Sequence, residues 1–136
     1  MHYTNETFVD MDFVGDGLYI ATEVWSVVEN SYRIGYLTFD TGSSVTVLEP
    51  EVFEMLGYKP IDKKPNILTT ASKVEQSPAF LLEKIKIGDF EIFDVEAHSL
   101  EFPIEGFSAG VIGLNVLRHF DIELLFSKGI IKLKKL

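Results

Sequence analysis

Apolar residues occur along this chain in short runs bounded by turn-forming residues, and no run shows the period of a long amphipathic helix. The runs at 18–28 and 34–39 are rich in β-branched and aromatic residues, so they predict two strands joined by a turn at 29–31. The Gly-Asp-Gly of 15–17 predicts a hairpin turn and not a phosphate-binding loop, because no further glycine motif follows it. The apolar run 45–48 predicts another strand.

The second half of the chain continues in strands. Residues 66–88 predict two strands around a polar tip at 70–73, and residues 90–100 predict a further strand. Residues 101–110 are expected to form a loop, and residues 122–134 a closing hairpin.

Two short helical segments interrupt the strands. Pro50 suits the first helical position and Gly57 suits the exit, so a helix is predicted at about 50–56. A second short helix is expected after Gly113. Because strands dominate and no linker divides the chain, the sequence predicts an all-β protein with a single domain, residues 1–136.

Charge and composition exclude several classes of partner. The chain has 21 Asp and Glu against 12 Lys and Arg, a formal net charge of −9, whereas nucleic-acid binding needs a basic surface. It has no cysteine, which excludes disulfides, zinc thiolates and thiol nucleophiles. The histidines lack metal-ligand spacing, so neither metal nor cofactor is expected. Since we find no secretory signal and no apolar run of about 20 residues, we expect a cytoplasmic protein without membrane contact.

One carboxylate lies at the end of a predicted strand. The apolar run 34–39 leads directly into Asp40-Thr41-Gly42, and another apolar strand follows this turn. The triplet alone is weak evidence, since Asp40 could serve only as a turn acceptor of backbone N–H groups while Gly42 adopts a positive φ. A carboxylate between apolar strands is nevertheless costly in a low dielectric, and such placements are typical of sites that use a shifted pKa.

A second strand end, Val111-Ile112-Gly113, also leads into a short helix, and Gly113 lies 73 positions after Asp40. Together with the Asp-Thr-Gly-Ser-Ser turn, the Pro-led helix and the closing strands, this pattern resembles a single-lobe, retroviral-type aspartic protease over roughly residues 18–134. The resemblance implies a closed-barrel-like retropepsin (acid protease) fold with one or two short helices, homodimeric, as in a bacterial-type cytosolic member. In that family the two strand ends cross beneath the catalytic carboxylate.

The chemistry of peptide hydrolysis fits this resemblance. Two carboxyl groups about 3 Å apart share one proton, so that one acts as a base toward water while the other donates to the carbonyl oxygen. Asp40 alone among the aspartates is followed by a hydroxyl residue and glycine. We therefore expect a homodimer that places the two copies of Asp40 across a two-fold axis, acting as an aspartic endopeptidase on peptide or protein substrates.

The resemblance assigns roles to the residues around Asp40. Thr41 would bond across the dimer axis, and Gly42 would donate its N–H to the carboxylate. Ser43 would bond the outer Asp40 oxygen, which favours the ionised form and predicts an acid-shifted pH optimum. The floor of the cleft would consist of Val111, Ile112 and Gly113.

Residues 67–82 resemble the hairpin flap that closes over the substrate in this family. The substrate-binding tip of the flap would consist of Thr70, Ala71, Ser72 and Lys73. This tip has no glycine, whereas retroviral flaps are glycine-rich, and a plain surface hairpin is the alternative. Leu114 is a second departure, since retroviral members often place arginine there, so the dimer is expected to rely on apolar packing and a terminal sheet. Asn115 is expected to cap the following helix.

Two other residues with reactive or aromatic side chains are expected to have structural roles only. His98 is expected to be a partly exposed strand residue, and Trp25 is expected to belong to the core. A rival function stays open, namely a non-catalytic peptide-binding or dimerisation module in which Asp40 is only a turn acceptor.

Overall fold

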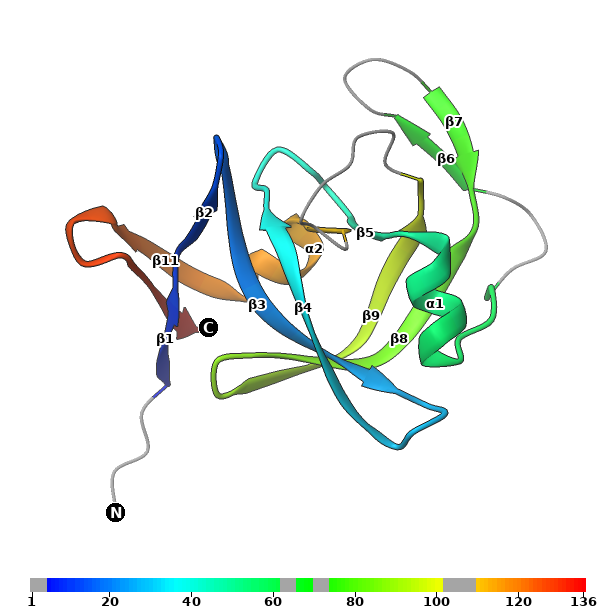
Figure 1. Cartoon of the computed structure of the whole chain (residues 1–136), viewed down its shortest axis with the longest axis horizontal. Helices are drawn as coiled ribbons and strands as arrows, with labels where there is room; N and C mark the ends of the chain where they lie inside the picture. Colours follow the sequence, from blue (N-terminus) through cyan, green and yellow to red (C-terminus); the bar gives the residue numbers. More distant parts are fainter. Residues whose placement is uncertain (1–4, 62–65, 70–73, 102–109) are drawn as a thin grey trace.

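The computed structural model describes residues 5–61, 66–69, 74–101 and 110–136, and most of them lie in β-strands (Figure 1). The prediction of an all-β protein with two short helices is confirmed. Within these described ranges, no helix has both the length and the apolar character needed to cross a bilayer.

The main sheet closes into a six-stranded barrel. Its strands are hydrogen-bonded in the order β2, β3, β4, β10, β5, β9, β8, and an additional pairing of β3 with β8 closes the ring without β2. The bounds are β2 (Asp12–Val14), β3 (Gly17–Ser26), β4 (Ser31–Phe39), β5 (Thr46–Leu48), β8 (Ala79–Ile87), β9 (Phe90–Ser99) and β10 (Gly110–Ile112).

The two ends of the chain form a second sheet of three strands. In this sheet β12 (Ile130–Lys135) lies between β1 (Glu6–Asp10) and β11 (Phe120–Leu125), and a 3-10 turn, η1 (Phe126–Lys128), joins β11 to β12. The closing hairpin is therefore confirmed. The sequence pattern did not predict β1, whose partner β12 lies at the far end of the chain, nor β2, although β2 pairs with β3 across the hairpin turn predicted at 15–17.

The segment 66–88 holds three strands where the sequence predicted two. β6 (Asn66–Thr69) and β7 (Val74–Ser77) form a separate two-stranded hairpin, and β8 begins after Pro78. Proline has no N–H to donate, so it interrupts the strand between the hairpin and the barrel. Figure 1 shows this hairpin on the same side of the barrel as the loop that follows β4.

The core of the barrel follows from strand alternation. Along β3 the buried side chains are Ile20, Thr22, Val24 and Ser26, and the residues between them are more exposed. Helix α1 (Pro50–Leu56) adds Phe53, whose ring stacks on Phe80 with a centroid distance of 3.9 Å. Gly57 ends α1 with a left-handed φ of 88°, which confirms the predicted bounds of this helix.

Candidate active site

The loop that carries Asp40 begins where two distant strands meet. β4 runs parallel to β10, with Phe39 opposite Ile112, and the Asp40 backbone N–H donates to the Ile112 carbonyl at 3.2 Å. β10 also pairs antiparallel with β5, so it lies between the strand that enters the loop and the strand that leaves it. The expectation that the two strand ends lie together is confirmed, whereas the role of Val111, Ile112 and Gly113 as the cleft floor stays a prediction.

The carboxylate of Asp40 is held by the turn that follows it. The Gly42 N–H donates to Asp40 Oδ1 at 2.8 Å, and the Ser43 N–H donates to the Asp40 carbonyl at 3.3 Å. A β-carbon on Gly42 would lie 3.1 Å from the same Oδ1, so glycine allows the backbone to approach the carboxylate closely. The positive φ at Gly42, which belonged to the alternative interpretation of Asp40 as a simple turn acceptor, is not observed, since this glycine is not among those with a left-handed backbone.

Ser43 does not make the hydrogen bond that the resemblance implied. Its Oγ donates to the Val45 carbonyl at 2.7 Å, so the single hydroxyl hydrogen is directed within the loop and away from Asp40. The structural basis for an acid-shifted optimum through Ser43 is therefore absent. Thr41 is exposed on the loop, and its bond across a dimer axis stays a prediction.

Gly113 joins β10 to α2 (Leu114–Leu117) and lies against the loop that follows Asp40. The N–H of Leu114 donates to the Ser43 carbonyl at 2.8 Å, and a β-carbon on Gly113 would lie only 2.2 Å from the Val45 carbonyl oxygen. A backbone oxygen cannot move away by a change of side-chain rotamer, so this clash could be relieved only by a shift of the main chain. A glycine is thus required for this close approach, although the backbone of Gly113 is extended.

The buried hydroxyl of Thr46, on β5, links this strand to Gly113 and to α2. Thr46 Oγ1 accepts the Gly113 N–H at 3.2 Å and donates to Asn115 Oδ1 at 2.9 Å, and Asn115 Nδ2 donates to the Glu96 carbonyl on β9 at 2.8 Å. The predicted capping role of Asn115 was wrong, because the N-cap of α2 is Gly113 and no side chain caps it. Sequence reasoning missed Thr46, since a threonine inside a strand carries no local signal of such a bond.

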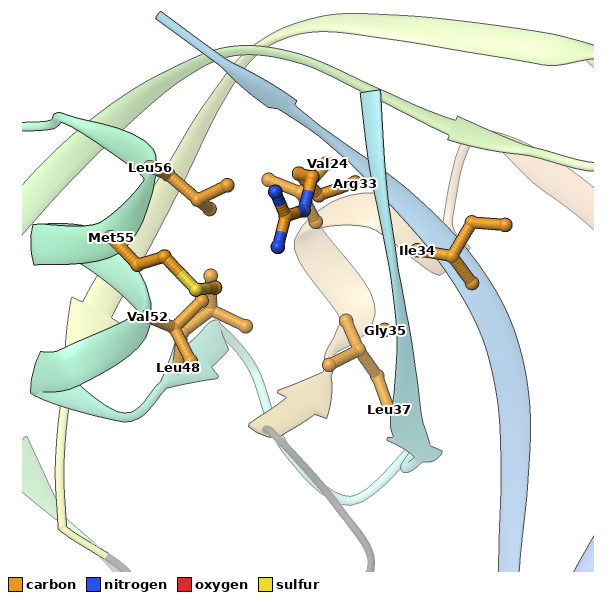
Figure 2. Close-up of a pocket in the computed structure, with 9 residues that line it drawn as sticks. All are labelled: Val24, Arg33, Ile34, Gly35, Leu37, Leu48, Val52, Met55 and Leu56. Carbon is orange, nitrogen blue, oxygen red and sulfur yellow. The ribbon is translucent and has the colours of Figure 1, made fainter. Parts of the chain in front are cut away.

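A small apolar cavity of about 70 Å³ lies behind β4 and β5, against α1. Figure 2 shows Leu37, Val52 and Met55 around this space, with the Arg33 guanidinium extending across it. Its size and apolar lining fit a packing gap behind the loop rather than a substrate site.

The predicted flap tip, Thr70 to Lys73, lies outside the described residues. At the base of the hairpin, Ser77 Oγ lies 3.2 Å from His98 Nδ1. The expectation that His98 is partly exposed was wrong, because the residue is only 6 % exposed. Among the described residues, no three His, Asp or Glu side chains are grouped so that they could hold a metal ion.

An aromatic and charged cluster lies on β3, β4, β8 and β9. Trp25 packs edge-on against Tyr32, and the Lys84 ammonium lies 4.2 Å from the centre of the indole ring. Because Trp25 is only half-buried, it lies at the surface of the barrel and not in the core where it was expected. The Tyr32 hydroxyl donates to the Glu91 carboxylate. Burial, followed by this hydrogen bond, raises the pKa of Tyr32, and the same bond lowers the pKa of Glu91.

Comparisons with known proteins agree with this architecture. The model of the aspartyl protease family matches residues 27–116, which include the Asp40 loop and Gly113. Among 56 matching chains of solved structures is a retropepsin-like aspartic protease from Rickettsia conorii, with a TM-score of 0.67 and 19 % identity. That match covers 98 % of this chain and 96 % of the other. None of the curated proteins is similar enough in sequence to be matched.

The family match spans more than half of the chain, and the solved structure shares its fold over nearly the full length. The chain therefore belongs to the aspartyl protease family, and its fold is retropepsin-like.

Proposed function

We propose that this protein is an aspartic endopeptidase in which Asp40 supplies one catalytic carboxyl group and Asp40 of a second copy supplies the other. The observation that carries the proposal is the single Asp-Thr-Gly, placed on a loop whose backbone N–H already binds the carboxylate. A family that works with a pair of aspartates needs a second one, and no other aspartate of this chain has the same sequence context.

The surroundings of the loop support contact with a second copy. Leu114, whose N–H bonds the loop at Ser43, is 39 % exposed, and Thr41 is exposed as well. An exposed leucine next to a catalytic loop is suited to apolar packing across a two-fold axis, where each residue faces its own copy. This contact would replace the arginine that retroviral members often carry at this position.

The proposed mechanism uses one proton shared by the two carboxyl groups. The ionised carboxylate accepts a proton from water, which attacks the peptide carbonyl carbon, while the protonated carboxyl group donates to the carbonyl oxygen. The Gly42 N–H stabilises a negative charge on Asp40 Oδ1. The carboxyl group that took the proton from water then donates it to the amide nitrogen, the other carboxylate takes a hydroxyl proton from the tetrahedral intermediate, and the C–N bond breaks to release the amine and carboxylic acid products.

Subunit mixing tests the shared pair directly. Wild-type chains are unfolded and refolded with a tenfold excess of Asp40→Asn chains, and cleavage of an unfolded protein substrate is measured between pH 3 and pH 7. If each site needs both aspartates, only about one in eleven wild-type chains pairs with another wild-type chain, and activity per wild-type chain falls in proportion. Unchanged activity per wild-type chain would refute the shared site.

Two further measurements separate this function from the rival one. Sedimentation of wild-type protein should show a dimer, and a strict monomer would contradict a composite site. Asp40→Asn should abolish cleavage while the circular dichroism spectrum and thermal midpoint stay unchanged. A wild-type protein that binds peptides but cleaves none of a varied set would instead favour a non-catalytic binding module.

A further inference from the structure

A groove of about 440 Å³ lies on the outer side of the barrel, away from the Asp40 loop. Its lining residues come from β1, the start of β2, β3, β4, β8 and the turn after β8. Because β1 belongs to the terminal sheet, the groove forms only where that sheet meets the barrel.

Large apolar side chains in the groove face solvent. Phe8 is 54 % exposed, Ile34 is 67 % exposed and Tyr36 is 39 % exposed. Figure 2 shows Ile34 on the opposite side of β4 from Arg33 and Leu37, so it points away from α1. Three such residues lining one groove leave apolar surface that a partner can cover.

The charges of the groove are unbalanced. Asp10, Asp12 and Glu23 line it, and Lys86 is the one cation among the described lining residues. Among the described residues, no lysine, arginine or histidine forms an ion pair with any of these three carboxylates. The groove therefore carries a net negative charge in addition to its apolar surface, and this combination favours a cationic, partly apolar partner.

The strand that lines the groove also leads to the catalytic loop. Tyr36 and Ile34 precede Asp40 on β4 by four and six residues. With a rise of about 3.3 Å per residue, they lie roughly 13 and 20 Å from Asp40 along the strand. A substrate protein held at Asp40 can thus reach the groove with a segment outside the residues that flank the cleaved bond.

We propose that this groove is an exosite that binds a cationic segment of protein substrates, with lysine or arginine against Asp10, Asp12 and Glu23 and a large apolar side chain against Phe8, Ile34 and Tyr36. The inference rests on the proposed proteolytic function for its biological role. A second copy of this chain is a poor occupant of this acidic groove, because its most lysine-rich segment is built into its own terminal sheet. Its basic strand β12 is already paired on both edges, by β1 and β11.

The decisive experiment measures binding without catalysis. A fluorescein-labelled peptide of alternating lysine with leucine and phenylalanine is titrated with Asp40→Asn protein, and anisotropy is recorded. In that background, Asp10→Asn/Asp12→Asn/Glu23→Gln should weaken binding about tenfold, since three charge contacts are lost. The matched control, Glu54→Gln/Glu101→Gln/Glu123→Gln, removes three exposed charges outside the groove and should leave affinity within about twofold.

A second pair of variants tests the apolar half of the exosite. Ile34→Asn should weaken binding of the same peptide, whereas Val28→Asn, at a residue 70 % exposed and outside the groove, should not. Equal losses for the two charge variants would show unspecific attraction and overturn the proposal. Equally tight binding of a counterpart peptide with glutamate in place of lysine would overturn it too.

Cleavage and peptide binding test the protease proposal and the exosite proposal separately. If wild-type protein cleaves nothing but the groove variant loses peptide affinity, the protease proposal fails while the binding site stands. If cleavage is intact and the groove variant binds the peptide as tightly as its parent, the exosite fails alone. In an active enzyme, the groove variant should raise KM for a substrate with a cationic apolar extension and leave kcat unchanged.

Discussion

Replacing Thr46 by valine tests whether the buried hydroxyl below the loop holds the two halves of the site together. Thr46 is 1 % exposed, and its Oγ1 links Gly113 on one side to Asn115 on the other. Valine has nearly the same shape, so the substitution removes both hydrogen bonds and leaves the packing almost unchanged.

The magnitude follows from the groups that lose their partner. The Gly113 N–H is buried, and leaving it unpaired costs about 1–3 kcal/mol. Asn115 Oδ1 is partly buried, and the loss of its hydrogen bond from Thr46 costs roughly a further 0.5–1.5 kcal/mol. The free energy of unfolding should therefore fall by about 2–4 kcal/mol, a large part of the stability of a domain of this size. Thr46→Ser keeps the hydroxyl and removes one methyl group, so it should cost only about 1 kcal/mol.

Urea unfolding followed by the fluorescence of Trp25, the single tryptophan, measures both variants. Protein concentration must be the same throughout, because dimerisation makes apparent stability depend on concentration. Thr46→Val should be the less stable of the two. If Thr46→Ser is the less stable, packing of the methyl group dominates and the hydrogen-bond argument is refuted.

Three further substitutions address the loop contact, the cavity and the charged cluster. Gly113→Ala should destabilise by about 3 kcal/mol or more in urea unfolding, because its β-carbon would lie 2.2 Å from the Val45 carbonyl. Val52→Ile should raise the thermal midpoint, with a gain of up to about 0.8 kcal/mol from one methylene placed in the 70 Å³ cavity. Tyr32→Phe should raise the pKa of Glu91 in a carboxyl NMR titration, since the hydrogen bond that lowers it is lost. In the wild-type protein, the ionised Glu91 stabilises the folded state at pH values above its ordinary pKa, and this contribution is lost as the pH falls through the lowered pKa. Tyr32→Phe should therefore make the free energy of unfolding depend less on pH in this acidic range.

Controls keep these outcomes interpretable. Gly17→Ala would place its β-carbon 2.8 Å from the Tyr19 ring, the movable end of a side chain, and should cost far less than Gly113→Ala. Similar losses at the two glycines would contradict the backbone-contact argument. A lower thermal midpoint for Val52→Ile would mean that the cavity is too narrow for the added group. An unchanged Glu91 titration in Tyr32→Phe would assign its lowered pKa to Lys84 instead.

The sequence by itself determined much of the barrel and the position of the candidate site. Runs of β-branched and aromatic residues, turn residues and the helix-starting proline are local signals, so β3, β4 and α1 were predictable within a few residues. The link between Asp40 and Gly113 was predictable for a different reason, since two strand ends with similar sequence character indicated a resemblance that spans the chain.

Only the tertiary structure decided which distant groups become partners. β1 pairs with β12, which lies at the other end of the sequence, and nothing in the short sequence of β1 indicates this partner. The hydroxyl of Ser43 turns to Val45, Thr46 bonds both Gly113 and Asn115, and His98 is covered beside Ser77, all through contacts set by strand packing. Local propensity acts over a few residues, whereas hydrogen-bond partners, burial and grooves depend on elements that meet only after the barrel closes and the terminal sheet packs against it.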